Sequence, residues 1–211
     1  MKKSKWIKHH RYFGLVLAFF LLMFCVSGIV LNHPSMFSHI NVGRNILPQQ
    51  YRFDKWNNGL MRGTIKWRNK VLVYGNAGVW LTDNSAKAFM DFNRGFPQGV
   101  DNRNIRGMAV MPSGELFAAG QYGLFRLSEQ KTWQAVNLAL LHDDRIVDMA
   151  TRGDTLVVTT RSQVFVARAP YRTFQSIELA APNDEAPRFT LFRTIWWLHS
   201  GELFGLVGKL I

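Results

Sequence analysis

An uncharged apolar run near the amino end limits most strongly what this chain can fold into. Residues 12–31 read YFGLVLAFFLLMFCVSGIVL and hold no charged side chain. A helix of this length rises about 1.5 Å per residue and spans about 30 Å, the thickness of a bilayer's hydrocarbon core. The run also lacks the polar face that a helix on a soluble core would need. We therefore predict a transmembrane helix over residues 12–32.

The charges before this run predict its direction in the membrane. Five basic residues precede it without any acidic one: Lys2, Lys3, Lys5, Lys8 and Arg11. Basic flanks stay on the cytoplasmic side, so residues 1–11 form a cytoplasmic tip and the chain beyond the helix is exported. A cleaved signal peptide is the alternative, with Val26-Ser27-Gly28 as the cleavage site. The apolar run continues through Leu31, which favours an uncleaved anchor.

The formal net charge of +12 would also suit a nucleic-acid-binding protein. Much of this excess lies in the cytoplasmic tip, and the later basic residues are mixed with acidic ones and form no known motif. We therefore expect no nucleic-acid partner. The single cysteine, Cys25, excludes an intramolecular disulfide and a cysteine-based zinc site. We interpret it as a small apolar side chain.

The exported stretch, residues 33–186, carries an internal repeat. Three segments each read as a short apolar strand, a tight polar turn, an alternating strand and a looser strand: 71–92, 114–136 and 154–177. Equivalent central positions follow one another at intervals of 45 and 40 residues: Val79, Leu124 and Val164. A period near 40 is typical of propeller blades, which stack because one blade cannot bury its own apolar face.

We predict a mainly β exported domain of about three propeller-like repeats. A closed propeller has four or more blades, so an open fragment, a compact sandwich and a ring completed by another chain all stay open. The domain holds no phosphate loop, metalloprotease helix, nucleophile elbow or calcium loop, so we predict no catalytic residue and no metal site. We interpret residues 142–144 (HDD) as a solvated loop. Its exposed turns are candidates for binding an unknown exported ligand or protein.

A second apolar segment, residues 187–211, follows the exported domain. Pro187 is well placed to open a helix, and Trp196 and Trp197 are typical of a membrane interface. Polar residues interrupt the segment: Arg193, His199, Glu202 and Lys209. We predict a second membrane or interfacial helix, and the bare ending at Ile211 indicates that this helix is truncated.

In a continuous helix, the polar residues and the glycines of this segment would lie on two different faces. One face would carry His199, Glu202, Leu206 and Lys209, and the other Gly201, Gly205 and Gly208. We expect the three glycines to let another membrane helix approach closely. His199 would then lie near the outer surface, at about the depth of His33. Two interpretations of His199 stay open: a hydrogen-bonded residue at the wet interface, or a haem or metal ligand.

The two ends of the chain together resemble PepSY-associated transmembrane proteins. The first end shares a basic tip, a glycine and a Ser-Gly pair with them: His10, Arg11, Gly14, Ser27 and Gly28. The second end shares a His-Ser-Gly stretch followed by Phe-Gly and Gly-Lys: His199, Ser200, Gly201, Phe204, Gly205, Gly208 and Lys209. The resemblance implies a bacterial inner-membrane protein whose exported, periplasmic domain lies between membrane helices.

The resemblance implies one function, and the anchored repeats favour another. Some members of the family are haem-containing reductases of ferric siderophores, with histidines of the membrane helices as haem ligands. His33 and His199 are the candidate ligands here, because a haem cannot join His10 to His199 across about 30 Å of membrane. The exported domain of this chain, however, has the sequence pattern of propeller blades and not that of the αβ module called PepSY. We therefore expect a module that binds an exported ligand or partner, with a haem-dependent redox protein of iron uptake as the alternative.

Overall fold

A computed structural model of the protein describes residues 2–46, 48–49, 61–141, 144–180 and 189–210. The chain divides into two compact units. The membrane unit combines Met1–Phe37 with Pro182–Ile211, and the β unit spans Ser38–Ala181.

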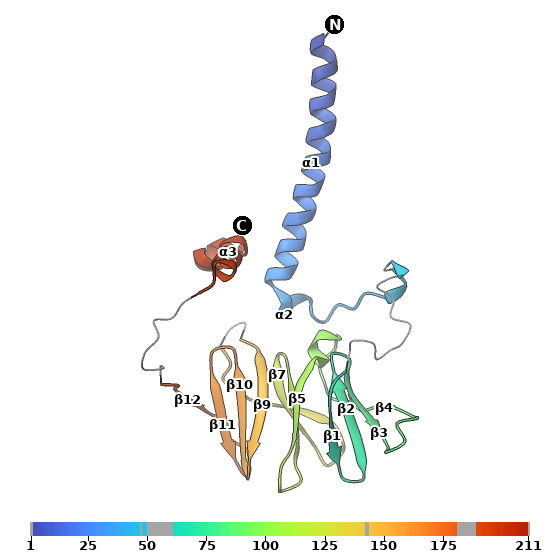
Figure 1. Cartoon of the computed structure of the whole chain (residues 1–211), viewed down its shortest axis with the longest axis vertical. Coiled ribbons are helices and arrows are strands. Elements are labelled where there is room, and N and C mark those ends of the chain that lie inside the picture. Colours follow the sequence, from blue (N-terminus) through green and yellow to red (C-terminus); the bar gives the residue numbers. More distant parts are fainter. Residues whose placement is uncertain (1, 47, 50–60, 142–143, 181–188, 211) are drawn as a thin grey trace. The chain divides into compact units, whose positions relative to one another are not determined.

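Helix α1 (Lys2–Asn32) confirms the predicted apolar helix at the amino end (Figure 1). Its portion Lys5–Asn32 is long and apolar enough to cross a membrane, and no other helix among the described residues is. The apolar side chains of this helix lie exposed, with Phe19 and Leu22 each 65% accessible. A long helix that buries none of its apolar surface in protein needs an apolar solvent, which the bilayer supplies.

The carboxyl-terminal segment is not one continuous helix, contrary to our prediction. It consists of α3 (Leu191–His199), a 3-10 turn η4 (Glu202–Phe204) and α4 (Gly205–Leu210). Helix α3 begins after Thr190, whose side chain accepts a hydrogen bond from the Arg193 N–H, and ends because Gly201 takes a left-handed φ of 72°. The helical face expected to join His199 to Glu202 therefore does not form. A second membrane-spanning helix over residues 187–211 is not confirmed.

Gly201 and Gly208 permit a close approach within this segment. A Cβ on either glycine would overlap the backbone carbonyl oxygen of the other. The chain thus folds back so that α4 approaches the Gly201 turn, which a straight helix could not do. Packing of Gly201, Gly205 and Gly208 against a further membrane helix stays a prediction.

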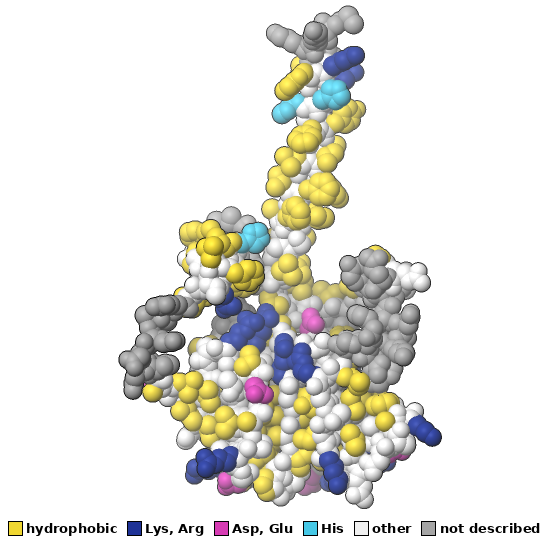
Figure 2. Space-filling view, viewed as in Figure 1, with side chains coloured by type: hydrophobic (Ala, Val, Ile, Leu, Met, Phe, Trp, Pro, Cys, Tyr) yellow, Lys and Arg dark blue, Asp and Glu magenta, His cyan; other side chains and the backbone are white. Residues whose placement is uncertain are grey.

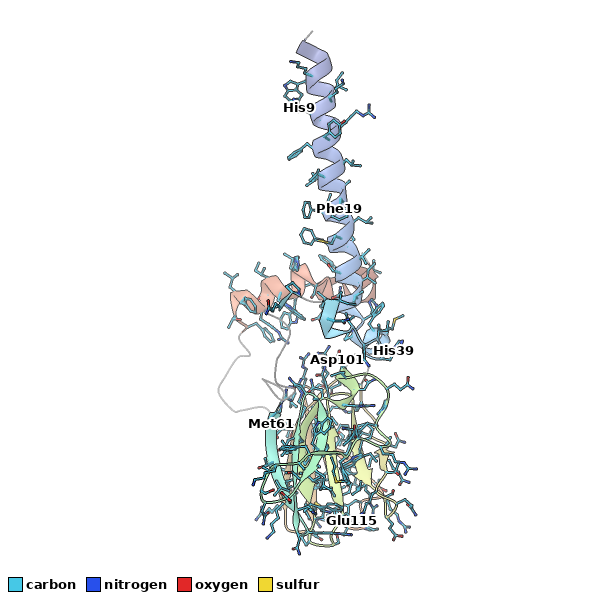
Figure 3. The ribbon with its side chains drawn as sticks, turned by 90° about the vertical axis from the view of Figure 1, so that its right-hand side faces the viewer. His9, Phe19, His39, Met61, Asp101 and Glu115 are labelled. Atoms are coloured by element: carbon cyan, nitrogen blue, oxygen red, sulfur yellow. The ribbon has the colours of Figure 1, made fainter. Side chains whose placement is uncertain are left out.

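The end of α1 meets the turn after α3. The Asn32 side-chain amide donates a hydrogen bond to the Ser200 carbonyl oxygen over 3.3 Å. A short helix α2 (Pro34–Phe37) follows α1 directly. Figure 3 shows α3 running across the direction of α1 within this unit.

The β unit confirms the predicted mainly β fold with three antiparallel sheets. Each sheet is a four-stranded meander whose strands lie in sequence order (Figure 1). The first sheet holds β1 (Met61–Trp67), β2 (Lys70–Gly75), β3 (Gly78–Thr82) and β4 (Met90–Asp91). The second holds β5 (Ile105–Val110), β6 (Leu116–Gly120), β7 (Gly123–Leu127) and β8 (Trp133–Val136). The third holds β9 (Ile146–Arg152), β10 (Thr155–Thr160), β11 (Val164–Arg168) and β12 (Gln175–Ile177). The described part of the unit also includes the single turns η1 (Arg44–Ile46) and η3 (Asp101–Arg103).

The middle sheet packs on both neighbours, because its two faces are both apolar. Strand β5 lies beside β1 on one side and β9 on the other. One face meets the first sheet around the aromatic pair Phe96 and Trp133, whose rings stack at 5.0 Å. The other face meets the third sheet around Phe117, which is fully buried and contacts the Tyr171 ring at 5.3 Å. Two cores thus hold the three sheets as one unit.

Candidate functional site

Three turns from the first two sheets enclose a groove of about 470 Å³ at one end of the β unit. They are the turns β1–β2, β5–β6 and β7–β8. Figure 3 labels Glu115 at this end and Asp101 at the opposite end of the unit. A volume of this size is in the range of small-ligand sites. We call this feature the turn groove.

Each of the three turns has a residue in the left-handed region at the groove. Gly114 adopts a φ of 90°, whereas Arg68 and Lys131 each have a φ of 56°. A residue with a Cβ adopts this conformation at a cost of about 1–2 kcal/mol. Both long cations line the groove. Strained turns that present charged side chains to one hollow are a reason to examine it for function.

An ion pair joins the β5–β6 turn to strand β7 at the groove. The Arg126 Nη2 atom lies 2.8 Å from the Glu115 Oε1 atom. The Ser113 hydroxyl donates a hydrogen bond to the same carboxylate, and a second Arg126 nitrogen donates to the Pro170 carbonyl oxygen over 3.4 Å. These bonds fix the position of the Arg126 guanidinium while its side chain keeps 37% of its accessible surface.

The same end of β1 combines an aromatic side chain with a cation. The indole of Trp67 is buried against the first core, and its residue lines the groove. The Arg68 guanidinium carbon lies 4.9 Å from the centre of the indole ring, within range of a cation–π contact. Arg68 is exposed, so its charge faces solvent and any ligand in the groove.

The groove combines basic and acidic side chains that can take part in polar contacts. The cations Arg68, Arg126 and Lys131 line the groove together with the acids Glu115 and Glu129. Their ammonium and guanidinium groups can bind carboxylate or amide oxygens, and the acids can accept hydrogen bonds. Among the residues that the structure describes, no group of three histidines, cysteines or acidic residues could hold a metal ion.

The sequence analysis did not find the turn groove. Its lining residues come from segments that lie some tens of residues apart in the sequence. Each of these segments, taken alone, has the composition of an ordinary turn. The segment around Pro112 and Gly114 was recognisable as a turn. The available signal was the concentration of charged residues in turns on the same side of successive repeats. Using that signal requires the strand register.

His33 and His199, the two candidate ligands, lie next to the two residues that join α1 to the turn after α3. His33 follows Asn32, and His199 precedes Ser200. The His33 Nδ1 atom lies 3.0 Å from the Ile29 carbonyl oxygen. When Nδ1 carries the proton and donates this hydrogen bond, Nε2 is left with a lone pair that can bind a metal. This arrangement is common for ligating histidines. The residues thus fit a ligand role for His33, while the structure gives no such contact for His199.

Asp144 has a structural role in the third sheet. It accepts hydrogen bonds from the Thr160 hydroxyl at 2.5 Å and the Ser162 hydroxyl at 2.6 Å. Burial acts to raise the pKa of Asp144, but these bonds and those from two backbone N–H groups outweigh it and hold the pKa below its ordinary value. His142 and Asp143, the rest of the HDD sequence, lie outside the described residues.

Comparison with known proteins gives a family and distant structural likenesses. No curated protein matches the chain. An ancestral GH74 enzyme is 14% identical at a TM-score of 0.45, covering 56% of this chain and 18% of that one. The extracellular domain of a proposed one-component system of B. thetaiotaomicron is 10% identical at a TM-score of 0.46, covering 55% and 16%. PorZ, a surface component of the type-IX secretion system of Porphyromonas gingivalis, is 14% identical at a TM-score of 0.42, covering 56% and 16%.

The chain spans less than a fifth of the length of these three solved structures. All three TM-scores lie below 0.5, so we base no functional conclusion on them. The family model for the PepSY-associated TM region, in contrast, matches residues 1–211. The match agrees with the apolar α1 and with the motif residues at both ends of the chain. The chain is therefore a membrane protein that belongs to the PepSY-associated TM region family.

Proposed function

We propose that this protein is a bacterial inner-membrane anchor that presents an exported β domain as a binding module. The basic tip before α1 supports a cytoplasmic amino end, because basic flanks are retained on that side. The β unit would then lie in the periplasm. The observation that carries the proposal is the turn groove, a hollow lined by charged turns on an otherwise closely packed unit.

A propeller-like arrangement of the three sheets accounts for the β unit best. The sheets are successive four-stranded meanders, and their first strands β1, β5 and β9 are neighbours. In the described part of the unit, the first and third sheets each share an apolar core with the middle sheet alone. The third sheet keeps Val147 and Ile177 each 46% exposed. An open run of three blades fits this pattern.

The groove is suited to a polar ligand or partner segment that carries a carboxylate. Three basic side chains line it, Arg68, Arg126 and Lys131, and Arg126 is already oriented by Glu115. A guanidinium held in this way can donate two parallel hydrogen bonds to a ligand carboxylate. Glu129 would bind a donor group of the same ligand.

Photo-crosslinking in intact cells tests this role. A benzoylphenylalanine at Gln130, an exposed position that lines the groove, should yield a discrete adduct, detected by intact-mass spectrometry. Arg126→Gln in the same protein should abolish the adduct while leaving the thermal midpoint within a few degrees. The same probe at Asn84, exposed in the β3–β4 connection, is the matched control and should give no adduct. An adduct that is unaffected by Arg126→Gln, or no adduct at either position, contradicts the proposal.

Helix α3 is suited to the membrane surface and too short to cross the membrane. It has nine residues, and most of its large apolar side chains are exposed, including Phe192 at 78%. The Arg193 guanidinium lies 5.1 Å from the Trp197 ring, a pairing of charge and aromatic surface that suits an interface. We infer that α3 lies in the interfacial plane, which corresponds to the interfacial alternative of the predicted second membrane or interfacial helix.

A haem-dependent redox function is the second candidate. The observation that favours it is the His33 ring, whose Nδ1 atom is bound to a backbone carbonyl and whose Nε2 atom is available. His199 would supply a second ligand from the turn that Asn32 holds. A haem bound there would supply one-electron chemistry. The chain's own contribution would be to orient the His33 ring.

A visible absorption spectrum of the full-length protein, purified in detergent from haem-replete cells, tests the second candidate. A Soret band that His33→Ala and His199→Ala each weaken would support it. His39→Ala is the matched control, since His39 is exposed and belongs to the β unit. A colourless protein, or a Soret band unchanged in both variants, would exclude haem at this pair.

A further inference from the structure

Two arginines occupy equivalent bulges in the first two sheets. In β1, the register passes from Met61 opposite Gly75 to Gly63 opposite Tyr74, so Arg62 is the extra residue. In β5, it passes from Ile105 opposite Gly120 to Gly107 opposite Ala119, so Arg106 is the extra residue. A bulge redirects a side chain out of the alternating strand pattern. The same device therefore positions a cation near the start of both strands.

Both bulge arginines are held by the adjoining hairpin turn. The Arg62 Nη2 atom donates to the Asn76 side-chain oxygen over 2.9 Å. The Arg106 Nη2 atom donates to the Gln121 side-chain oxygen over 2.8 Å. Asn76 and Gln121 directly follow β2 and β6, so they hold equivalent places in the repeat. An amide oxygen orients the guanidinium without neutralising its charge.

The third sheet adds two more cations to the same group. The Arg145 guanidinium lies 5.6 Å from the centre of the Tyr122 ring, next to Gln121. Arg161 directly follows β10, the place that Gln121 holds in the second sheet. Its backbone N–H donates to Asp144 over 3.1 Å, which fixes the turn while the Arg161 residue stays exposed. We call Arg62, Arg106, Arg145 and Arg161 the arginine cluster.

The four charges act on one another. Burial lowers the pKa of the Arg106 guanidinium, and the charges of Arg62, Arg145 and Arg161 lower it further. In the part of the chain that the structure describes, Glu115–Arg126 is the one ion pair, so no described carboxylate pairs directly with a cluster guanidinium. The Asp144 carboxylate lies beside the cluster, bound to the backbone N–H groups of Arg145 and Arg161. The Nε atoms of Arg103 and Arg106 are buried without a hydrogen-bond partner among these residues. Figure 2 shows basic side chains gathered over the corresponding ends of β5 and β9.

The cluster lies away from the turn groove. It surrounds the start of β5, directly after η3, whose Asp101 Figure 3 labels at the end opposite Glu115. The chain also enters the β unit here, because the Asn41 side chain accepts a hydrogen bond from the Val100 N–H at 3.0 Å. A ligand bound at the arginine cluster would therefore act independently of the turn groove.

We propose that the arginine cluster is a binding site for a phosphate-type oxyanion, either free phosphate or a lipid headgroup. Planar guanidinium groups bind such oxyanions through paired, charge-assisted hydrogen bonds. Three sheets contribute to the cluster, so a bound anion would relieve the repulsion between cations that the fold holds together. A ligand rich in acceptor oxygens also suits guanidinium groups, which are donors only.

Titration calorimetry of the full-length protein in dodecyl maltoside, with inorganic phosphate as the probe, tests the site. The titration is run against sodium chloride of equal ionic strength, which removes general screening. We expect saturable phosphate binding that Arg106→Gln and Arg161→Gln each weaken by at least about tenfold. Arg161→Gln guards against misfolding, because Arg161 donates its hydrogen bonds to Asp144 and to the Arg145 carbonyl oxygen from its backbone N–H, which the substitution keeps. Arg152→Gln, exposed near the other end of β9, is the matched control and should bind like the parent protein.

Mixed micelles with phosphatidylglycerol distinguish the two sources of the anion. If the lipid headgroup occupies the site, the added lipid should suppress phosphate binding in the parent protein. If the free anion is the ligand, phosphate should bind equally with and without the lipid. Either result supports the site. Phosphate binding that is absent, or that is unchanged in both cluster variants, would overturn the proposal.

Discussion

The two units of the chain differ in whether they bury their large apolar side chains. Phe117 in the β unit is fully buried, whereas Phe19 in α1 is 65% exposed. In the β unit, apolar side chains of three stacked sheets pack on one another, whereas the large apolar side chains of α1 lie exposed in the described chain. The difference shows that the β unit supplies its own core, while the membrane unit relies on lipid for the burial of its apolar surface.

The largest effect should come from a core cavity in the β unit. Phe117→Ala removes a fully buried ring that contacts Tyr171, and it should lower the unfolding free energy by about 3–5 kcal/mol. Denaturant unfolding in detergent, followed by near-ultraviolet circular dichroism, measures this loss. Phe20→Ala in α1 is the control and should leave the same transition in place. Equal losses in the two variants would show that the contrast between the units is wrong.

The second prediction sharpens the description of the membrane unit. A Cβ on Gly201 would overlap the Gly208 backbone, and φ is also left-handed there, so Gly201→Ala should cost more than about 1–2 kcal/mol locally. In Gly205→Ala the added Cβ lies in open space, so the only cost should be the backbone strain of a positive φ. Amide hydrogen exchange in α4 measures both. A continuous helix predicts the reverse, since alanine stabilises a helix by about 1 kcal/mol over glycine.

The third prediction is a pH dependence confined to the β unit. The pKa of Asp144 is lowered in the fold, so its stabilisation is present above the ordinary value of 3.8 and is lost as pH falls through the folded pKa. Asp144→Asn should therefore cost about 1–3 kcal/mol at pH 7. The difference from the parent protein should shrink as pH falls below 3.8, and it should vanish only below the folded pKa, which is lower still. Denaturant unfolding at several pH values measures it, with Asp101→Asn as an exposed control. A difference that persists at low pH would show that the carboxylate charge is not the cause.

The smallest effect concerns the groove ion pair. Glu115 and Arg126 keep 19% and 37% of their side-chain surface, so their coupling should be about 0.2–1 kcal/mol. A double-mutant cycle of Glu115→Gln and Arg126→Gln measures it. A coupling well above this range would mark the pair as a structural element of the fold and weaken its proposed role in binding.

The sequence predicted the elements that depend on local composition. The apolar run of α1 and the three strand-rich repeats both follow from patterns read along the chain. The first strand of each sheet, β1, β5 and β9, lay outside the three predicted segments. In β1 few positions are buried, with Trp67 alone below one-tenth exposure. The break at Gly201 was misread, because a glycine spaced for helix packing looks the same as one in a left-handed turn.

Both candidate sites in the β unit depend on long-range geometry. Arg62 and Arg106 become equivalent only when the strand register reveals their bulges. Arg68 and Lys131 meet at the groove because turns from different sheets converge there. His33 and His199 were chosen from sequence, and the Asn32–Ser200 hydrogen bond lies beside both in the chain. Whether they bind a cofactor stays a prediction.

Cysteine labelling tests the central claim, an exported groove occupied by a ligand or partner, most directly. With Cys25→Ala as background, a membrane-impermeant maleimide is applied to Gln130→Cys and to Asn84→Cys, in intact cells and in purified protein. We predict labelling of position 84 in both preparations, and labelling of position 130 in purified protein with strong protection in cells. Equal labelling of position 130 in both preparations would contradict an occupied groove. A position 84 that stays unlabelled in intact cells would contradict export.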